Sequence, residues 1–265
     1  MPRYSLAHHV FVCRQDGHVV FLDVKKDRYF ALPSAQTAGL ADLVPGWPVD
    51  SGLPLGARSC GLESTDTPAA QAADADTVQP LSEPPECGSL PPVLELLLEQ
   101  GILISSERGG KSAVPVAPAS PETELIVDEL DDTRPVKPIA FLRFVRSAIV
   151  ARLLLKHRSF EYVVKRVHER NLANRDRGDA LGPDRLLHAV AAFAALRPFF
   201  FTVKDECLFD ALALSEFLSG YRVFPQWIFG VQARPFAAHC WLQLGNTVLN
   251  DTVEHVRRYA PIMAV

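Results

Sequence analysis

Three residues stand in an order along the chain that would suit a nucleophilic acyl-transfer site: Cys207, His239 and Asp251. A cysteine thiolate attacks an acyl carbon. A histidine holds the thiolate as an ion pair and then protonates the leaving amine, and a carboxylate orients the imidazole. The chain has five cysteines and eight histidines. Residue type alone therefore does not select these three. The helices and strands that carry them must also bring them together.

Cys207 stands at the predicted start of a helix, within "TVKDECLFDALALSEFLSGYRV". Thr202 followed by Asp205 resembles a capping box, and Gly220 is expected to end the helix. Almost every residue over 208–218 is apolar or small, which is typical of a helix buried on all sides. Free N–H groups at a helix start favour a thiolate. The alternative is that Cys207 is a small buried hydrophobe, the usual role of a free cysteine.

His239 lies in the predicted strand "AAHCWLQL". Successive strand side chains point to opposite faces, so Cys240 belongs to an apolar face and is expected to be inert packing. His239 points the other way, toward a cleft or solvent, and the two neighbours cannot react with each other. Without further context His239 is equally well a partly exposed strand histidine. Gln243 shares its face but lies two residues beyond it, so the second oxyanion donor stays unassigned.

The loop after this strand decides whether Asp251 can reach His239. A two-residue turn at 245–246 would place Asp251 across from Cys240, on the wrong face. A three-residue loop at 244–246 sets Asp251 directly opposite His239, where cross-strand Cβ atoms lie about 5 Å apart. The catalytic interpretation therefore predicts the three-residue loop, and a two-residue turn would contradict it.

The N-terminal part is rich in strands. "HHVFVC", "VVFLDV" and "RYFAL" predict a three-stranded meander over residues 8–32, with Asp16-Gly17 as a hairpin turn. A short helix is expected from Ser34 to about Leu43, with Ser34 as its N-cap. Nine of the 21 prolines fall within about 45–92, which predicts an irregular stretch. "VLELLLEQGIL" then predicts a helix that ends at Gly101.

The remaining chain predicts helices followed by a short antiparallel sheet. Proline-rich sequence indicates a linker over 108–138. Beyond it we expect two helices, a third helix stopped by Pro198, the helix of Cys207, and strands in "QWIFGVQ", "AHCWLQL" and "TVLNDTV". The fold class is therefore α+β, with one domain over 1–107 and a second over 139–265.

Composition narrows the function. The net charge is −4, which argues against a general nucleic-acid binder. No CxxC pair, P-loop or signal-peptide pattern is present, and we expect no metal and no cofactor. The longest apolar stretch is interrupted by arginines, so no stable membrane insertion is expected. We expect a soluble, cytoplasmic protein with reduced thiols.

A resemblance to a known family follows from three stretches together. "CLFDALALSEFLSGYRV", "IFGVQARPFAAHCWLQL" and "VLND" resemble the B proteins of lasso-peptide biosynthesis, which are transglutaminase-like cysteine proteases that act as leader peptidases. "YSLAHHVFVCRQDGHVVFLDVKKDRYFAL" and "VLELLLEQGIL" resemble the PqqD-like recognition element of the same systems, a small winged-helix-like domain. The aspartate in "CLFD" departs from the basic residue that the family often carries shortly after the cysteine.

The resemblance implies a function and a set of residues. The N-terminal domain captures the leader of a ribosomally made lasso precursor peptide, and the C-terminal domain cleaves leader from core. A separate asparagine-synthetase-like cyclase then closes the macrolactam. The family's catalytic triad carries over to Cys207, His239 and Asp251. The leader adds as a strand, which maps to these residues: Arg28, Tyr29, Phe30, Ala31, Leu32, Val93, Leu94 and Leu97.

Two other functions remain open on the sequence. The same triad could pass the acyl group to an amine, as a transamidase does, or Cys207 could be packing in a non-catalytic leader-binding chaperone. A group of basic residues could contact an acidic leader, a membrane surface or the cyclase, or could simply be a solvated face. These are Arg143, Arg146, Arg152, Lys156, Arg158, Lys165 and Arg166.

Overall fold

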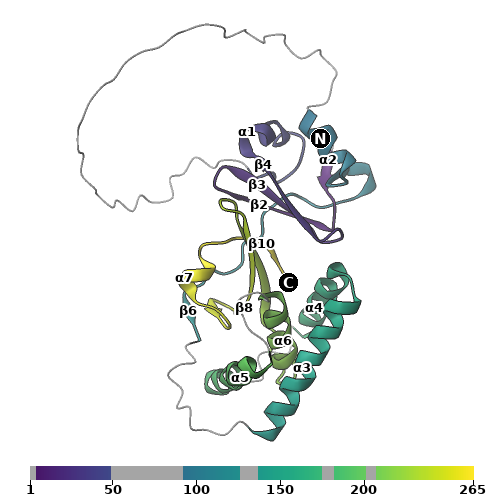
Figure 1. Cartoon of the computed structure of the whole chain (residues 1–265). Coiled ribbons are helices and arrows are strands. Elements are labelled where there is room, and N and C mark those ends of the chain that lie inside the picture. The colour runs from purple at the N-terminus through teal and green to yellow at the C-terminus, as the bar shows by residue number, and fades with distance from the viewer. Residues whose placement is uncertain (1–3, 49–91, 126–136, 175–181, 201–206) are drawn as a thin grey trace, which may run out of the picture.

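The computed structural model describes residues 4–48, 92–125, 137–174, 182–200 and 207–265, and the strands in these ranges form three sheets (Figure 1). The small sheet pairs β1 (Tyr4–Leu6) with β5 (Leu103–Ser105). A three-stranded sheet has the order β2 (Val10–Gln15), β3 (His18–Asp23) and β4 (Arg28–Pro33). A five-stranded sheet has the order β10 (Ala260–Ala264), β7 (Gln226–Gln232), β8 (Ala237–Leu244), β9 (Thr247–Val248) and β6 (Thr123–Glu124).

The predicted meander is confirmed as β2, β3 and β4. Gln15 pairs with His18, so only two residues form the first turn. Both have positive φ, 48° at Asp16 and 73° at Gly17. This is the backbone of the two-residue turn that best fits the twist of paired strands, and Asp-Gly is a favoured sequence for it.

The helix predicted after the meander is shorter than expected. α1 spans Ser34–Thr37 and continues as one 3-10 turn, η1 (Ala38–Leu40). Ser34 is its first residue and not its N-cap: the cap position is Pro33, with no side-chain cap hydrogen bond. The Ser34 hydroxyl instead accepts a hydrogen bond from Arg14 Nε, 3.1 Å away, so it joins α1 to β2.

α2 (Pro92–Glu99) confirms the second N-terminal helix. Gly101 has φ 70°, and the N–H groups of Gly101 and Ile102 donate to the carbonyls of Leu98 and Leu97. This pattern is the Schellman ending that a glycine at this position favours. The expected irregular stretch over 45–92 falls, for residues 49–91, outside the described residues.

The described helices of the C-terminal part include one that is buried on all sides. They are α3 (Pro138–His157), α4 (Phe160–Asn174), α5 (Pro183–Leu196), η4 (Arg197–Phe199), α6 (Cys207–Ser219) and α7 (Val253–Val256). α3 and α5 pack on α6, which lies against β8. Every residue of α6 from Phe209 to Leu218 is buried, so the prediction of a central helix is confirmed. The expected capping-box residues Thr202 and Asp205 lie outside the described residues.

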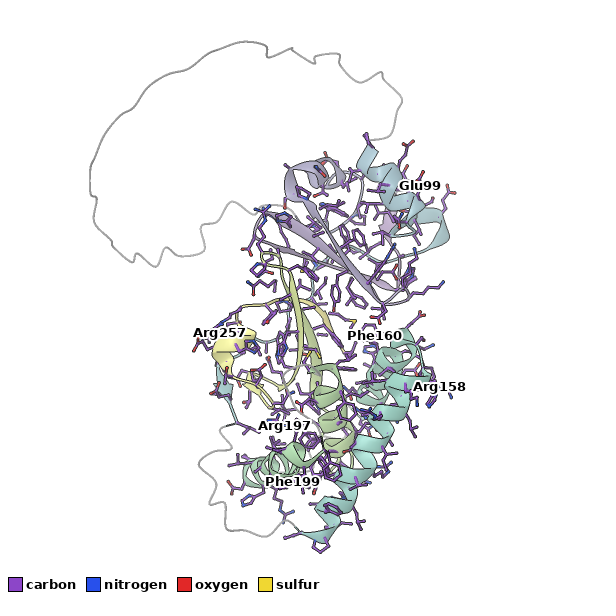
Figure 2. All side chains as sticks on the ribbon, viewed as in Figure 1. Glu99, Arg158, Phe160, Arg197, Phe199 and Arg257 are labelled. Atoms are coloured by element: carbon purple, nitrogen blue, oxygen red, sulfur yellow. The ribbon has the colours of Figure 1, made fainter. Side chains whose placement is uncertain are left out.

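The three-stranded sheet is buried on both faces. On β3, Val20 and Leu22 belong to the same apolar core as α6, β7 and β8. Val19 and Phe21 point the other way, into a second core formed with α2 and Trp47. β2 lies beside β10, and Figure 2 shows side chains filling the space between the two parts, with Phe160 close to the junction. The N-terminal sheet is therefore a wall shared by two cores.

Three segments of the C-terminal sheet differ from expectation. Within the expected linker, Thr123–Glu124 forms β6, which pairs in parallel with β9. The strand expected over "TVLNDTV" is extended only at Thr247–Val248, because the chain then bends away. β10 was not predicted. It contains Pro261 and a register shift next to it, which an edge strand tolerates because one side of its backbone needs no partner.

Two members of the predicted basic group, Arg166 and Arg143, contact α6 or the turn that follows it. Arg166 contacts the buried carboxylate of Glu216 at 2.6 Å, and Arg170 contacts the same oxygen at 2.7 Å. The guanidinium of Arg143 lies 4.2 Å from the ring centre of Tyr221. These contacts tie α4 and α3 to α6 and its C-terminal turn, so part of the positive charge serves the fold.

Candidate active site

Cys207 is the first residue of α6 and is half-buried. A hydrogen bond from the thiol of Cys240 has the largest effect on the pKa of Cys207 and lowers it. Burial comes next and raises this pKa, and a hydrogen bond with His239 lowers it further. Together they lower the pKa of the Cys207 thiol to about 4. Cys207 is therefore a thiolate at neutral pH, the form in which a cysteine is nucleophilic.

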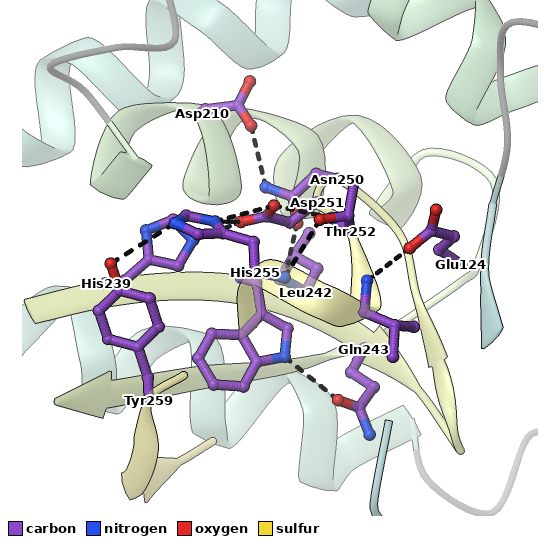
Figure 3. Close-up of polar contacts among 12 residues, drawn as sticks. Glu124, Asp210, His239, Leu242, Gln243, Asn250, Asp251, Thr252, His255 and Tyr259 are labelled. Atoms are coloured by element: carbon purple, nitrogen blue, oxygen red, sulfur yellow. Dashed lines mark hydrogen bonds and ion pairs between the residues drawn. The ribbon is translucent and has the colours of Figure 1, made fainter. Parts of the chain in front are cut away.

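His239 lies on β8 between Cys207 and Asp251. Its Nε2 is 2.5 Å from Asp251 Oδ2 (Figure 3). Burial works against its charge, but the hydrogen bonds with Asp251 and Cys207 prevail and raise the pKa of His239 to about 9. An ionised carboxylate only accepts hydrogen bonds, so Nε2 carries a hydrogen and Nδ1 is left for Cys207. The pair is a thiolate beside an imidazolium.

The loop that leads to Asp251 contradicts our expectation. Leu244 pairs with Thr247, so the turn has two residues and not three. In that register Asp251 would fall on the wrong face if β9 continued. β9 ends at Val248 instead, and the bend that follows carries Asp251 off the ladder and up to His239. The geometric test that we attached to Asp251 was wrong because it assumed an unbroken strand.

A buried polar clamp holds this bend. The side chain of Asn250 accepts a hydrogen bond from Leu242 N at 2.9 Å and donates one to Asp210 Oδ2, also at 2.9 Å. Asp210 is one turn along α6 from Cys207 and is 1 % exposed. Burial raises the pKa of its carboxyl, against hydrogen bonds from Asn250 and Arg197. The clamp links the helix of the nucleophile to the loop of the aspartate.

Asp251 has hydrogen-bond partners in addition to His239. Its Oδ1 accepts from the backbone N–H of Thr252 at 2.7 Å, and both oxygens lie within 3.0 Å of His255 Nδ1. Burial alone would raise the pKa of Asp251, but these hydrogen bonds and the one from His239 hold it below its ordinary range. The carboxylate therefore stays ionised beside the imidazolium.

Sequence reasoning missed four neighbours of the triad: Asn250, His255, Tyr259 and the active role of Cys240. Cys240 is buried, as expected, yet its thiol and its backbone N–H both donate to Cys207, so it is not inert packing. The spacing of Asp251 and His255, four residues apart on either side of the N-cap Thr252, was a usable signal for a short helix that brings them together. Nothing in the sequence marked Cys240 as a neighbour of Cys207.

Gln243 does not serve as an oxyanion donor in this arrangement. It is 1 % exposed, and its Nε2 donates to the carbonyls of Ala119 and Gly245 at 2.7 and 2.8 Å. Its Oε1 accepts from Trp241 Nε1. The amide is satisfied by the chain itself, so it fixes the β8–β9 turn to the segment before β6.

A metal could find ligands in one place among the described residues. His239, Asp251 and His255 offer ligand atoms that lie within 4.8 Å of one another, a donor set that suits Zn²⁺. The same atoms are already joined to one another by hydrogen bonds. These hydrogen bonds among the three side chains are the arrangement that a catalytic hydrogen-bond chain requires.

The residues expected to bind a leader peptide fall into four groups. Phe30, Leu32 and Val93 are half-buried along the side of β4 that faces α2. Leu94 and Leu97 are fully buried in the core beneath. The exposed Arg28 donates to Gln100 Oε1 at 2.7 Å, and Ala31 is also exposed.

Tyr29 forms the fourth group and packs on the side of the sheet opposite Phe30 and Leu32. Its ring packs against the core that contains Cys207, and its centre lies 5.8 Å from the ring centre of Phe236 in the β7–β8 turn. Burial, with additional repulsion from Cys240, Asp27 and Cys207, raises the pKa of the Tyr29 phenol. Tyr29 therefore brings β4 close to the nucleophile.

Comparison with known proteins agrees with this arrangement in the C-terminal part. Residues 141–264 match the family model of the transglutaminase-like superfamily, so this part of the chain is similar to a transglutaminase-like domain. No curated protein and no solved structure matches the chain. None of the described helices has the length and apolar character that crossing a membrane requires.

Proposed function

We propose that the protein is a leader peptidase of ribosomal lasso-peptide biosynthesis, which hydrolyses the bond between leader and core through Cys207. The observation that carries the proposal is the hydrogen-bonded chain from Cys207 through His239 to Asp251, in which the pKa of the thiol is lowered to about 4 and that of the imidazole is raised to about 9. This is the charge state that a cysteine peptidase needs before its substrate binds.

Each residue has a step in the proposed reaction. The Cys207 thiolate attacks the carbonyl carbon of the scissile peptide bond, and the electron pair moves to the carbonyl oxygen. His239 gives its Nδ1 proton to the leaving amine as the C–N bond breaks, which releases the core and leaves the leader as a thioester. A water molecule then loses a proton to His239 and displaces Cys207. Asp251 keeps the imidazole in the required tautomer throughout.

Leader capture is proposed at the free side of β4. Among the described residues, β4 pairs only with β3, so its outer backbone groups are available to an added strand. Phe30, Leu32 and Val93 are half-buried beside that edge and offer apolar contacts for alternate side chains of the peptide. Leu94 and Leu97 support this surface from beneath and do not touch the peptide.

Tyr29 supports joining the two activities in one chain. A peptide added as a strand would pair with β4. The Tyr29 side chain of β4 reaches toward Cys207 and Phe236. Capture at β4 and cleavage at Cys207 would then take place on elements that pack against the same core. The core peptide would pass to a separate asparagine-synthetase-like cyclase, which we propose as the partner.

Mass spectrometry of a lasso precursor peptide mixed with the full chain tests the proposal. The native protein is expected to release the leader, and Cys207→Ala to abolish release while the leader still binds with unchanged Kd. Phe30→Asp is expected to weaken leader binding and to leave alkylation of Cys207 by iodoacetamide unchanged. Cleavage that survives Cys207→Ala would reject the peptidase assignment.

A primary amine added to the same reaction distinguishes transamidation from hydrolysis. A leader that carries the mass of the amine would identify an acyltransferase, whereas a free leader acid identifies a peptidase.

A further inference from the structure

We infer that His255 is a positioning residue of the active site, a second imidazole that holds the Asp251 carboxylate in place beside His239. The inference rests on the triad of the proposed function and extends it to a five-membered chain: Cys207, His239, Asp251, His255 and Tyr259. Nothing in the three-residue triad requires the last two members.

The hydrogen bonds fix which nitrogen of each imidazole carries a hydrogen. Nδ1 of His255 lies 3.0 Å from Asp251 Oδ1 and 2.9 Å from Oδ2, so it straddles the carboxylate. Since an ionised carboxylate only accepts, this nitrogen must be the donor. His239 meets Oδ2 with its Nε2. The two imidazoles therefore grip one carboxylate with opposite nitrogens.

The backbone around His255 leaves it little freedom. α7 is a single turn, and its N-cap Thr252 accepts a hydrogen bond from His255 N at 3.2 Å. Glu124 of β6 accepts from Val253 N at 2.5 Å, which ties the start of α7 to the sheet. The ring is thus set by its own helix before it meets Asp251.

Three aromatic rings lie close together beside the carboxylate. The ring centre of His255 lies 4.8 Å from that of His239 and 5.4 Å from that of Tyr259. The Tyr259 hydroxyl is 3.5 Å from His255 Nε2, a long contact. Of the other charged groups of this turn, Glu254 and Arg258 pair with each other at 2.6 Å, and Arg257 donates to the carbonyl of Pro121. His255 therefore faces the carboxylate of Asp251 and the imidazolium of His239.

Two consequences follow for catalysis. Asp251 cannot rotate without breaking its contacts with both His255 and Thr252 N–H, so the oxygen that orients His239 is held before substrate arrives. The pKa of Asp251 is also kept below its ordinary range partly by the hydrogen bond from His255. A carboxylate that stays ionised and fixed is what makes an aspartate effective behind a catalytic histidine.

Comparing three substitutions of His255 in the full chain tests the inference. The amide nitrogen of asparagine can occupy the position of Nδ1, whereas that of glutamine lies nearer the position of Nε2. His255→Asn is therefore expected to keep most of kcat for leader cleavage. His255→Gln and His255→Ala are expected to lower kcat by roughly ten- to hundredfold, with little change in KM, as loss of a hydrogen bond to a charged group predicts.

A second measurement does not depend on the substrate. The pH dependence of Cys207 alkylation by iodoacetamide reports the thiolate directly, and its acid limb is expected to move to higher pH in His255→Ala and His255→Gln but not in His255→Asn. Glu254→Gln, on the same turn and exposed, is the matched control and should behave as the native chain does.

The outcomes separate the two levels of the argument. Equal loss in all three His255 variants, or no loss in any, would overturn the positioning role. An alkylation profile that His239→Ala leaves unchanged would instead overturn the triad itself, and with it the proposed function. If the native chain fails to cleave the precursor, the alkylation profiles still decide the role of His255.

Discussion

The charges of Cys207 and His239 set the working pH range of the site. The thiol has its pKa lowered to about 4, so it loses its charge only when the pH falls through that value. The imidazole has its pKa raised to about 9, so it loses its proton when the pH rises through that value. Between the two limits the thiolate–imidazolium pair is complete.

We therefore expect kcat/KM for leader cleavage to follow a bell-shaped curve, with an acid limb near pH 4 and an alkaline limb near pH 9. The limbs belong to the coupled pair and not to single residues. Stopped assays across this range, with alkylation of Cys207 as a parallel readout, provide the measurement. An acid limb near the ordinary thiol pKa of about 8.5 would show that the pair does not form.

Replacing Asp251 by asparagine should slow the enzyme without unfolding it. Asparagine fills the same space but can present its amide N–H₂ to His239, which favours the wrong tautomer, and an equivalent change in a serine protease costs about 10⁴-fold in kcat. We expect a loss of up to that size, with a melting temperature close to that of the native chain. Cleavage at the native rate would remove Asp251 from the mechanism.

At the scale of elements, a glycine determines how closely the rings around His239 pack. Gly230 of β7 faces His239 of β8 in the strand register. A Cβ at this position would lie 2.7 Å from Tyr259 Cβ and 2.9 Å from Trp241 Cζ3, closer than real contacts allow. The strand can bring Tyr259 and Trp241 together over the histidine only because this position has no side chain.

Gly230→Ala is accordingly expected to destabilise the protein by about 1–3 kcal/mol, the usual cost of overfilling a packed site, and to lower kcat by displacing Tyr259. Gly39→Ala is the control, since a Cβ there meets nothing within 4 Å. Chemical denaturation and cleavage assays on both variants give the comparison. Equal stability of the two variants would contradict the predicted clash.

The sequence predicted those elements whose pattern is local. Two short runs of consecutive apolar residues joined by Asp16-Gly17 predict β2 and β3, and the apolar run of α6 predicts a buried helix. The bend after Val248 was not predictable in the same way, because it depends on Asn250 reaching Asp210 across the fold. β10 was hidden by Pro261, whose cost disappears only at the edge of a sheet.

In the candidate site, too, some residues could be predicted from the sequence and some contacts could not. Cys207, His239 and Asp251 were found from order and residue type, and the structure brings them together. The contact of Cys240 with Cys207 depends on how deeply α6 packs against β8, and the grip of His255 depends on a one-turn helix. Both are set by tertiary packing, which neither spacing nor periodicity encodes.

At the scale of the whole molecule, β3 contributes side chains to both cores, so we expect the described parts to unfold together. Its Leu22 is fully buried in the core that contains α6, and the neighbouring Phe21 is fully buried in the core that contains α2. Two cores that share one strand lose their packing at the same moment, so we expect a single calorimetric transition.

Leu22→Ala should lower the free energy of unfolding by about 2–5 kcal/mol, as other large-to-small core changes do. Leu142→Ala, at a site 62 % exposed on α3, is expected to change it little. Differential scanning calorimetry of both variants tests the shared core. Two resolved transitions, with only the N-terminal one shifted by Leu22→Ala, would show that the domains unfold independently.

The shared strand also limits how such a protein could be re-targeted. A laboratory chimaera that joins a foreign recognition module to the C-terminal part would have to retain the side of the meander formed by Cys13, Val20, Leu22 and Val24. The opposite side, which includes Val19 and Phe21, could be exchanged together with α2. A graft that replaces the whole N-terminal part would instead expose the apolar residues of the C-terminal core that the meander covers.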